Sequence, residues 1–106
     1  DQPSQKTLEK VKYRISSKAL EDIDRIWLYT LENWSLEQAD RYYRLLYQEI
    51  NCIVEDFETG KDIGKIKFGY RQAKMKSHLL IYKRADDGII EIVRVLHQMM
   101  DIPNRL

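Results

Sequence analysis

The sequence has few of the residues that cross-link or metallate small domains. Its 106 residues include a single cysteine, Cys52, which excludes an internal disulfide and a zinc site built from cysteines. With one thiol and no secretory signal, the chain is expected in a reducing compartment, and the cytoplasm is the predicted location. Cys52 itself is predicted to be a small filler of the core.

Cofactor-binding motifs are absent as well. Only four glycines occur, and they form no Walker loop, Rossmann pattern or nucleophile elbow. Zinc-ligand spacing is also missing, so we expect no cofactor and no metal. Neither His78 nor His97 has a cysteine, a Ser–Asp pair or paired carboxylates at a diagnostic spacing. This argues against nucleophilic triads and dinuclear metal sites.

Charge of one sign is not in excess, because the formal net charge is only +1. The molecule as a whole is therefore unlike a strongly basic domain that binds polyanions. No window approaches the roughly 20 apolar residues of a membrane-spanning helix, so no membrane association is predicted. A composition of 43% hydrophobic and 33% charged residues is typical of one globular domain that folds unaided.

The first half of the chain predicts a strand followed by two helices. Residues 1–10 are polar and aperiodic and are predicted to be a tail or extension, which leaves 11–106 as a single domain. Residues 11–16 alternate apolar and polar side chains, as a half-buried strand does. From residue 17 onward apolar side chains recur every three or four positions, which predicts an amphipathic helix with Ser16 or Ser17 as its N-cap.

A second helix is predicted to begin at Ser35, whose spacing to Gln38 is that of a capping box, and to end before Thr59-Gly60. Only Asn33 and Trp34 separate the two predicted helices. So short a link predicts an antiparallel helical hairpin whose apolar stripes face one partner surface.

The second half predicts a sheet. Strands are expected at 70–75, 77–84 and 88–97, and Asp86-Asp87-Gly88 is expected to form a tight hairpin turn. The order β-α-α-β-β-β predicts an α+β fold in which the helical hairpin packs on one face of a twisted, mainly antiparallel sheet. The other face is expected to be left to water or to a partner.

The last predicted strand contains an unexpected charge. Strict alternation places Arg94 with Ile90, Ile92 and Leu96 on one face and His97 with Val93 and Val95 on the other. Arg94 is therefore expected either to pair with a helix acid such as Asp24 or Glu49, or to face an external anion. His97 is interpreted either as a general acid, a general base or a hydrogen-bond donor to phosphate, or as a structural side chain packed against Met99 or Met100.

Basic residues are concentrated in the sheet half. They are interleaved with Phe68, Tyr70 and Tyr82, a pattern that suits a phosphate backbone or an acidic protein groove. Ordinary solvated sheet positions explain the same pattern equally well. The residues concerned are Lys61, Lys65, Lys67, Arg71, Lys74, Lys76, Lys83 and Arg84.

Two long segments resemble a known family. They are "YRISSKALEDIDRIWLYTLENWSLEQADRYYRLL" and "GYRQAKMKSHLLIYKRADDGIIEIVRVLHQMMD", and they resemble the ParE branch of the RelE/ParE toxin superfamily of bacterial type II toxin-antitoxin systems. The matching features are "A-x-x-D-I-x-x-I-W-x-Y-T", "W-S-x-x-Q-A-x-x-Y", "H-L-L-I-Y-K" and "I-V-R-V-L-H-x-x-M-D". The resemblance covers residues 11–106 and implies the same α+β fold.

The resemblance implies a toxin that inhibits DNA gyrase, arrests growth and is neutralised by a ParD-like antitoxin in a hetero-oligomer. Nucleic acid would then be contacted only indirectly, through the target, and this chain would catalyse nothing. Two alternatives stay open. One is a ribosome-dependent mRNA endoribonuclease like the RelE relatives, with His97, Arg94 and Arg71 as the catalytic set. The other is an inactive homologue that only binds antitoxin.

Site residues follow from these hypotheses. Target binding is assigned to the basic and C-terminal residues Arg71, Lys74, Lys76, Arg94, His97, Met99 and Met100. Antitoxin binding is assigned to aromatic side chains of the helical hairpin, because such side chains bury area at low entropic cost. They are Trp27, Tyr29, Tyr43 and Tyr47.

Overall fold

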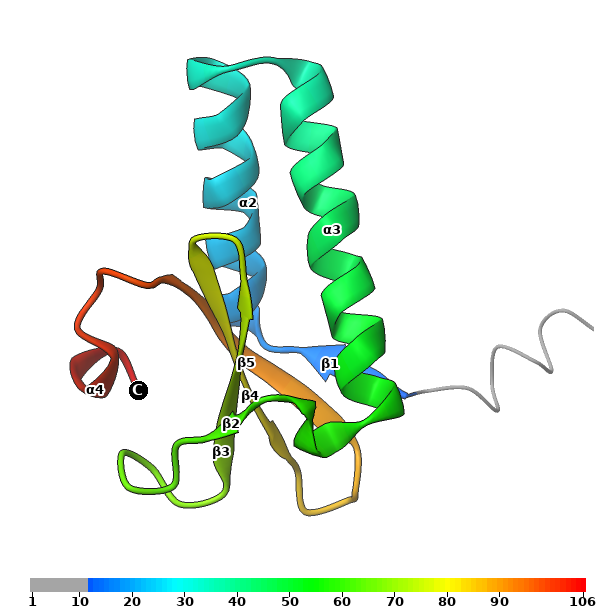
Figure 1. Ribbon diagram of the computed structural model, residues 1–106, viewed down its shortest axis with the longest axis vertical. Coiled ribbons are helices and arrows are strands. Elements are labelled where there is room, and N and C mark those ends of the chain that lie inside the picture. Colours follow the sequence, from blue (N-terminus) through cyan, green and yellow to red (C-terminus); the bar gives the residue numbers. More distant parts are fainter. Residues whose placement is uncertain (1–11) are drawn as a thin grey trace, which may run out of the picture.

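A computed structural model describes residues 12–106 (Figure 1), so the predicted tail 1–10 lies outside the described residues. Helices α2 and α3 form an antiparallel pair that rises from one side of a twisted sheet. The elements in chain order are β1 (Tyr13–Ile15), α2 (Ser17–Asn33), α3 (Leu36–Glu55), the short 3₁₀ helix η1 (Phe57–Thr59), β2 (Lys61–Asp62), β3 (Tyr70–Met75), β4 (His78–Arg84), β5 (Ile90–His97) and α4 (Ile102–Arg105).

The sheet has five strands in the order β1-β5-β4-β3-β2. Strand β1 pairs with β5 in parallel, and the other pairs are antiparallel. The predicted α+β fold with a helical hairpin on a mainly antiparallel sheet is therefore confirmed. Strand β2 was not predicted, because it is only two exposed residues long and has no apolar alternation to signal it.

The helix starts follow local chemistry. The Ser16 hydroxyl accepts a hydrogen bond from the Ala19 amide at 3.0 Å, and the Ser35 hydroxyl accepts one from the Gln38 amide at 3.1 Å. Both serines have extended backbone and so act as N-caps. The predicted helical hairpin and the capping role of Ser35 are confirmed. Within residues 12–106, no helix combines the length and apolar character needed to cross a bilayer.

The main core lies between the helical hairpin and the sheet. The hairpin contributes Ala19, Ile23, Leu46, Ile50 and Ile53, and the sheet contributes Ala73, Met75, Leu80, Tyr82, Ile90, Ile92 and Val95. The fully buried Tyr82 hydroxyl donates to the Phe57 carbonyl at 2.7 Å and accepts from the Gly60 amide at 3.0 Å. This pair of bonds joins the end of the helical hairpin to the middle of the sheet.

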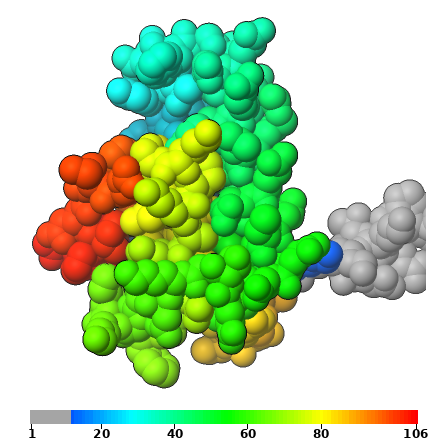
Figure 2. Space-filling view, in the orientation of Figure 1, coloured from blue at the N-terminus to red at the C-terminus, as the bar shows by residue number. Residues whose placement is uncertain are grey.

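The opposite face of the sheet carries a second apolar cluster of Ile63, Tyr70, Leu79, Ile81 and Leu96, against which Val93, Ile102 and Leu106 pack. Figure 2 shows residues near the C-terminus lying against the β4 region of the surface. The expectation that this face is left to water or a partner was wrong in part. The chain's own last turn covers some of it, because α4 folds back over the strands.

A β-bulge in β5 changes the faces of its last residues. Ile81 pairs with Arg94 and Tyr82 pairs with Ile92, so Val93 is the extra residue. Beyond the bulge, Val95 lies in the main core with Ile92, and Leu96 lies in the second cluster. The predicted alternation was therefore wrong after Ile92, because a strand register with period two cannot anticipate an inserted residue.

Cys52 was predicted to fill the core, but its side chain is exposed on α3. It lies one position from the apolar stripe that Ile50 and Ile53 define on this helix. A rotation of about 100° per residue is enough to turn a side chain from the sheet toward water. The thiol therefore has no part in the packing of the core.

Candidate functional site

An open groove of about 750 Å³ lies between the upper turns of the helical hairpin and the ends of β4 and β5. We call it the hairpin groove. Figure 1 shows why it exists, because α2 and α3 continue well beyond the strands that they cover at their lower ends. Its lining residues are Asp22, Arg25, Ile26, Tyr29, Thr30, Trp34, Gln38, Tyr42, Ser77, His78, Val95, His97 and Met100.

The apolar stripe of α2 serves two purposes along its length. Its first part, with Ala19 and Ile23, is buried in the core. Its continuation, with Ile26 and Trp34, lines the hairpin groove. The same three-to-four residue spacing produces both parts, since periodicity specifies a face of the helix and not what covers that face.

The floor of the groove contains a chain of three rings. The Tyr42 hydroxyl and Nδ1 of His78 lie 2.6 Å apart. His78 faces His97 across the β4–β5 pair, with ring centroids 5.3 Å apart in an edge-on arrangement. Nδ1 of His97 accepts the Met99 amide at 3.1 Å, so the neutral ring carries its hydrogen on Nε2.

Burial makes most of this floor uncharged at neutral pH. It lowers the pKa of His78, and a positive charge on His97 lowers it further, whereas the negative charge of Asp22 acts in the opposite direction. Burial likewise raises the pKa of the Tyr42 hydroxyl. His78 is thus neutral and Tyr42 protonated at pH 7, a state that suits an apolar occupant.

One wall of the groove depends on Asp22, which is only 5% exposed. Its carboxylate accepts two hydrogen bonds from the Arg94 guanidinium, at 2.8 and 3.0 Å, and one from the Val95 amide at 2.9 Å. Burial alone raises the pKa of Asp22, but these bonds outweigh it, so the pKa lies below its ordinary value. Arg25 adds a bond at 3.2 Å from the groove side.

Arg94 was expected to pair with a helix acid such as Asp24 or Glu49. An acid of a helix is indeed its partner, but that acid is Asp22. Strand β1 pairs with β5 only as far as Ile92, which leaves the edge of β5 open from Val93 onward. The start of α2 fills this edge, because the Ser16 hydroxyl donates to the Val93 carbonyl at 2.8 Å. Asp22 lies about one and a half turns along α2, where its carboxylate accepts the next amide of this edge, that of Val95.

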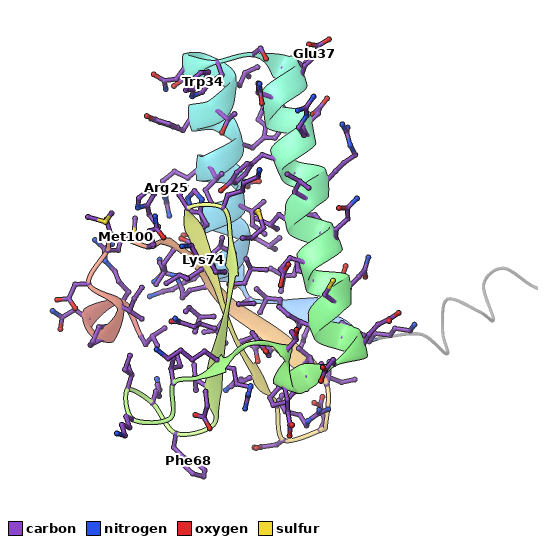
Figure 3. All side chains as sticks on the ribbon, in the orientation of Figure 1. Arg25, Trp34, Glu37, Phe68, Lys74 and Met100 are labelled. Carbon is purple, nitrogen blue, oxygen red and sulfur yellow. The ribbon has the colours of Figure 1, made fainter. Side chains whose placement is uncertain are left out.

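The mouth of the groove is apolar and exposed. Trp34 is 74% exposed at the tip of the helical hairpin, and Tyr29 lies one turn below it. Figure 3 shows Met100 and Arg25 beside each other on the same flank, below Trp34. Large exposed apolar side chains gathered around a groove mark an interaction site.

The residues predicted to bind the target do not form one cluster. His97 and Met100 line the hairpin groove, Met99 is exposed beside Met100, and Arg94 lies behind the wall. Lys76 lies in the β3–β4 turn next to Ser77 of the groove, with a positive φ of 58°. The remaining two residues, Arg71 and Lys74, lie on β3 outside the groove.

Lys74 and Arg71 point to opposite faces of β3, since strand side chains alternate. Lys74 lies between Ala73 and Met75, whose side chains enter the main core, so it faces away from the groove. Arg71 packs its guanidinium 5.8 Å from the Phe57 ring centroid and donates to the carbonyls of Gly60 and Glu58.

The predicted basic face is likewise divided between the two sides of the sheet. Arg71 and Arg84 stack on Phe57 on the side of the helical hairpin. Lys67 and Lys83 lie over the Tyr70 ring on the other side. The basic residues of the sheet half therefore do not gather on one face, and Tyr82, which was interleaved with them in the sequence, belongs to the core.

Of the residues predicted to bind antitoxin, only Tyr29 lines the hairpin groove. The Trp27 indole donates to Asp40 at 3.3 Å across the helical hairpin. Tyr43 and Tyr47 stack on each other on α3, with ring centroids 4.9 Å apart. Trp27 and Tyr43 line a small separate crevice between the two helices.

Several groove residues were not among the predicted site residues, notably Tyr42, His78 and Trp34. Tyr42 and Trp34 belong to apolar stripes that predict core packing, and no sequence signal separates the uncovered part of a stripe from the covered part. Residues 12–106 contain no group of three or more His, Cys, Asp and Glu side chains placed to hold a metal ion.

Comparison with known proteins identifies the family. Residues 13–102 match the family described as "ParE toxin of type II toxin-antitoxin system, parDE". Toxin ParE1 of Mycobacterium tuberculosis is 35% identical over 95 residues, covering 90% of this chain and 97% of the relative. Toxin ParE1 of Caulobacter vibrioides is 39% identical over 90 residues, covering 84% and 91%.

The fold is also found in a solved structure, described as the chromosomal ParDE TA system from P. aeruginosa. It superposes with a TM-score of 0.70 at 15% identity, over 82% of this chain and 95% of that chain. The agreement extends over nearly the whole of the relatives' length, and the family match spans all five strands and both long helices. This chain therefore belongs to the ParE toxin family of type II toxin-antitoxin systems.

Proposed function

We propose that this chain inhibits DNA gyrase and is held inactive by a ParD-like antitoxin that occupies the hairpin groove. The observation that carries the proposal is the groove itself, which is open, apolar at its mouth and uncharged at Tyr42 and His78 on its floor. Membership of the ParE family supports the antitoxin as partner. A toxin–antitoxin hetero-oligomer in the cytoplasm follows from the same proposal.

An amphipathic segment of the antitoxin suits this groove. Its apolar side chains would lie against Tyr29, Trp34 and Met100, in the way that amphipathic helices bind apolar grooves. Arg25 lies on the rim, and its side chain is largely exposed beside Asp22. An acidic residue at the edge of the antitoxin segment would pair with it, which fixes the orientation of the segment.

The described contacts favour target binding over ribonuclease chemistry. The endoribonuclease alternative needs Arg71, Arg94 and His97 around one phosphate. Arg71 instead donates to main-chain carbonyls near Phe57, and Arg94 is committed to Asp22. His97 is thus left without the two cations that would neutralise a phosphate in the transition state.

The test compares two targets with the same preparation of toxin, separated from its antitoxin. One assay measures supercoiling and DNA cleavage by purified gyrase, and the other measures mRNA cleavage on ribosomes. We expect inhibited supercoiling, trapped DNA breaks and intact mRNA, all reversed by adding antitoxin. Cleaved mRNA with unaffected gyrase would overturn the proposal, and inactivity in both assays would favour a homologue that only binds antitoxin.

A further inference from the structure

A short loop at the end of the molecule opposite the hairpin tip carries an unusually exposed aromatic side chain. We call residues 64–69 the lysine–phenylalanine loop, since its sequence is Gly-Lys-Ile-Lys-Phe-Gly. Phe68 is 94% exposed, the highest value among the exposed large apolar side chains of residues 12–106. Figure 3 shows it pointing away from the body of the protein.

The loop is closed by its own hydrogen bonds. Ile63 donates its amide to the Tyr70 carbonyl at 3.0 Å, and its own carbonyl accepts the amides of Ile66 and Lys67 at 2.8 and 3.1 Å. The Tyr70 amide donates a hydrogen bond to the Lys67 carbonyl at 3.1 Å, and Gly69 adopts a positive φ of 85°. The many internal bonds of this loop lower the backbone ordering cost of presenting Phe68 to a partner.

The loop is anchored at both ends of its base. Ile63 and Tyr70 are buried in the second apolar cluster, under the sheet. Asp62 accepts the Gly64 amide at 2.7 Å, which fixes the first turn of the loop. The exposed Phe68 is therefore a feature held by buried neighbours and not the end of a loose segment.

The surroundings of Phe68 are cationic. Residues 61–67, which lead into Phe68, contain three lysines, Lys61, Lys65 and Lys67, and one acid, Asp62. Asp62 is engaged with the loop's own backbone and with Arg71. In the part of the chain that the structure describes, no lysine forms a salt bridge with an acidic side chain. The lysines around the loop are thus not engaged in ion pairs with acidic side chains.

Two lysines are held close to the base of the loop. The ammonium groups of Lys67 and Lys83 lie 5.3 and 5.6 Å from the Tyr70 ring centroid. The same ammonium of Lys67 donates to the main-chain oxygen of Leu106 at 3.3 Å. Lys65 and Lys67 thus belong to the loop that carries Phe68, and Lys83 lies at its base.

We propose that the lysine–phenylalanine loop is a wedge that contacts the DNA bound by gyrase, with Phe68 stacking against or between bases and Lys65 and Lys67 meeting phosphates. This inference rests on the proposed function. An apolar side chain inserted at a base step, flanked by cations on the backbone, is a recurring way of holding deformed DNA. An acidic pocket of the gyrase protein is the competing partner, and the experiment separates the two.

A wedge at this position adds a direct DNA contact to a toxin that was expected to meet nucleic acid only through its target. If Phe68 unstacks the base pairs at the site where gyrase has cut the DNA, the broken ends move out of alignment and gyrase reseals them slowly. The toxin itself makes and breaks no bond. The role explains why an apolar ring is displayed to water in a rigid loop that needs no such ring for its own stability.

The decisive experiment replaces Phe68 by the photoreactive p-benzoylphenylalanine and irradiates the complex of toxin, gyrase and labelled DNA. We expect the toxin to become attached to the DNA strand. Attachment only to a gyrase polypeptide, or no attachment at all, would overturn the wedge. The matched control carries the same photoreactive residue at Trp34, at the opposite end of the molecule, and is expected to leave the DNA unlabelled.

Variants provide an independent measurement. Phe68→Ala is expected to reduce trapped DNA breaks about tenfold, in keeping with the loss of one base stack. Phe68→Trp is expected to retain activity, and both variants are expected to bind antitoxin as the wild type does. If Phe68→Ala traps as many DNA breaks as the wild type, the proposed contact of Phe68 with DNA is wrong, whereas the proposal of gyrase inhibition stands. If the wild type traps none, the gyrase proposal fails, and the wedge with it.

Discussion

The carboxylate of Asp22 and the guanidinium of Arg94 form a two-pronged ion pair that joins the first turns of α2 to the bulged end of β5. The same carboxylate accepts the Val95 amide, which is a donor on the edge that β1 leaves unpaired. The hairpin groove has its wall at this joint. The ion pair therefore adds to the packing of the core a polar link between the helical hairpin and the sheet, formed by residues 72 positions apart.

Asp22→Asn is expected to lower the free energy of unfolding by about 3 kcal/mol, because removing one partner leaves the mostly buried Arg94 charge uncompensated. Urea denaturation at pH 7 measures the loss. Asp24→Asn is the matched control, since Asp24 is exposed on the same helix. A loss shared equally by both variants would show that the ion pair is unimportant.

The same carboxylate predicts an acid-dependent loss of stability. The pKa of Asp22 in the folded protein lies below its ordinary value, so its contribution is fully present above about pH 4. It is lost as the pH falls through the lower, folded-state pKa. We expect the difference in unfolding free energy between wild type and Asp22→Asn to shrink as the pH falls from 5 toward 2. A constant difference would contradict this account.

His78 predicts a second pH dependence, at higher pH. Its folded-state pKa is lowered by burial and by His97, so the unfolded chain takes up a proton more readily than the folded protein. Stability is therefore greatest above the unfolded pKa of about 6.5 and declines as the pH falls below it. His78→Gln is expected to flatten this decline in denaturation experiments between pH 7.5 and 5.

Gly60 predicts a backbone constraint. A Cβ there would lie 2.5 Å from the Tyr82 hydroxyl and 2.6 Å from the Gln72 main-chain oxygen. Because the backbone of β3 cannot move freely, Gly60→Ala is expected to cost about 1–3 kcal/mol. Thermal unfolding measures it. In the control Gly64→Ala, the new Cβ meets only the flexible Asp62 carboxylate, at 2.9 Å, and the expected cost is about 0.5 kcal/mol or less.

The hairpin groove predicts which aromatic side chains hold the antitoxin. Trp34→Ala is expected to weaken antitoxin binding by roughly tenfold or more, as truncation of an aromatic anchor does. Leu28→Ala is the control, because Leu28 is exposed on α2 but does not line the groove. Calorimetric titration with antitoxin compares the two. Equal affinities would place the antitoxin elsewhere, and the Tyr43–Tyr47 pair would become the next candidate.

The elements with local signals were predictable from the sequence. Strand β3 was predicted over 70–75 and has those bounds, and Ser35 caps α3 through Gln38 as its spacing indicated. These features depend on residues within a few positions of one another. The partner of Arg94 was not predictable in this way, because the Val93 bulge and the open edge of β5 are properties of strand pairing.

The amino-acid sequence by itself determined the order of the elements, the apolar face of each helix and, through its resemblance, the family. Only the tertiary structure decided where the sheet ends beneath the helical hairpin. That end point divides one continuous stripe into a buried part around Ile23 and an open part around Trp34. The physical reason is that periodicity specifies the direction of a side chain, whereas burial depends on which distant segment lies opposite it.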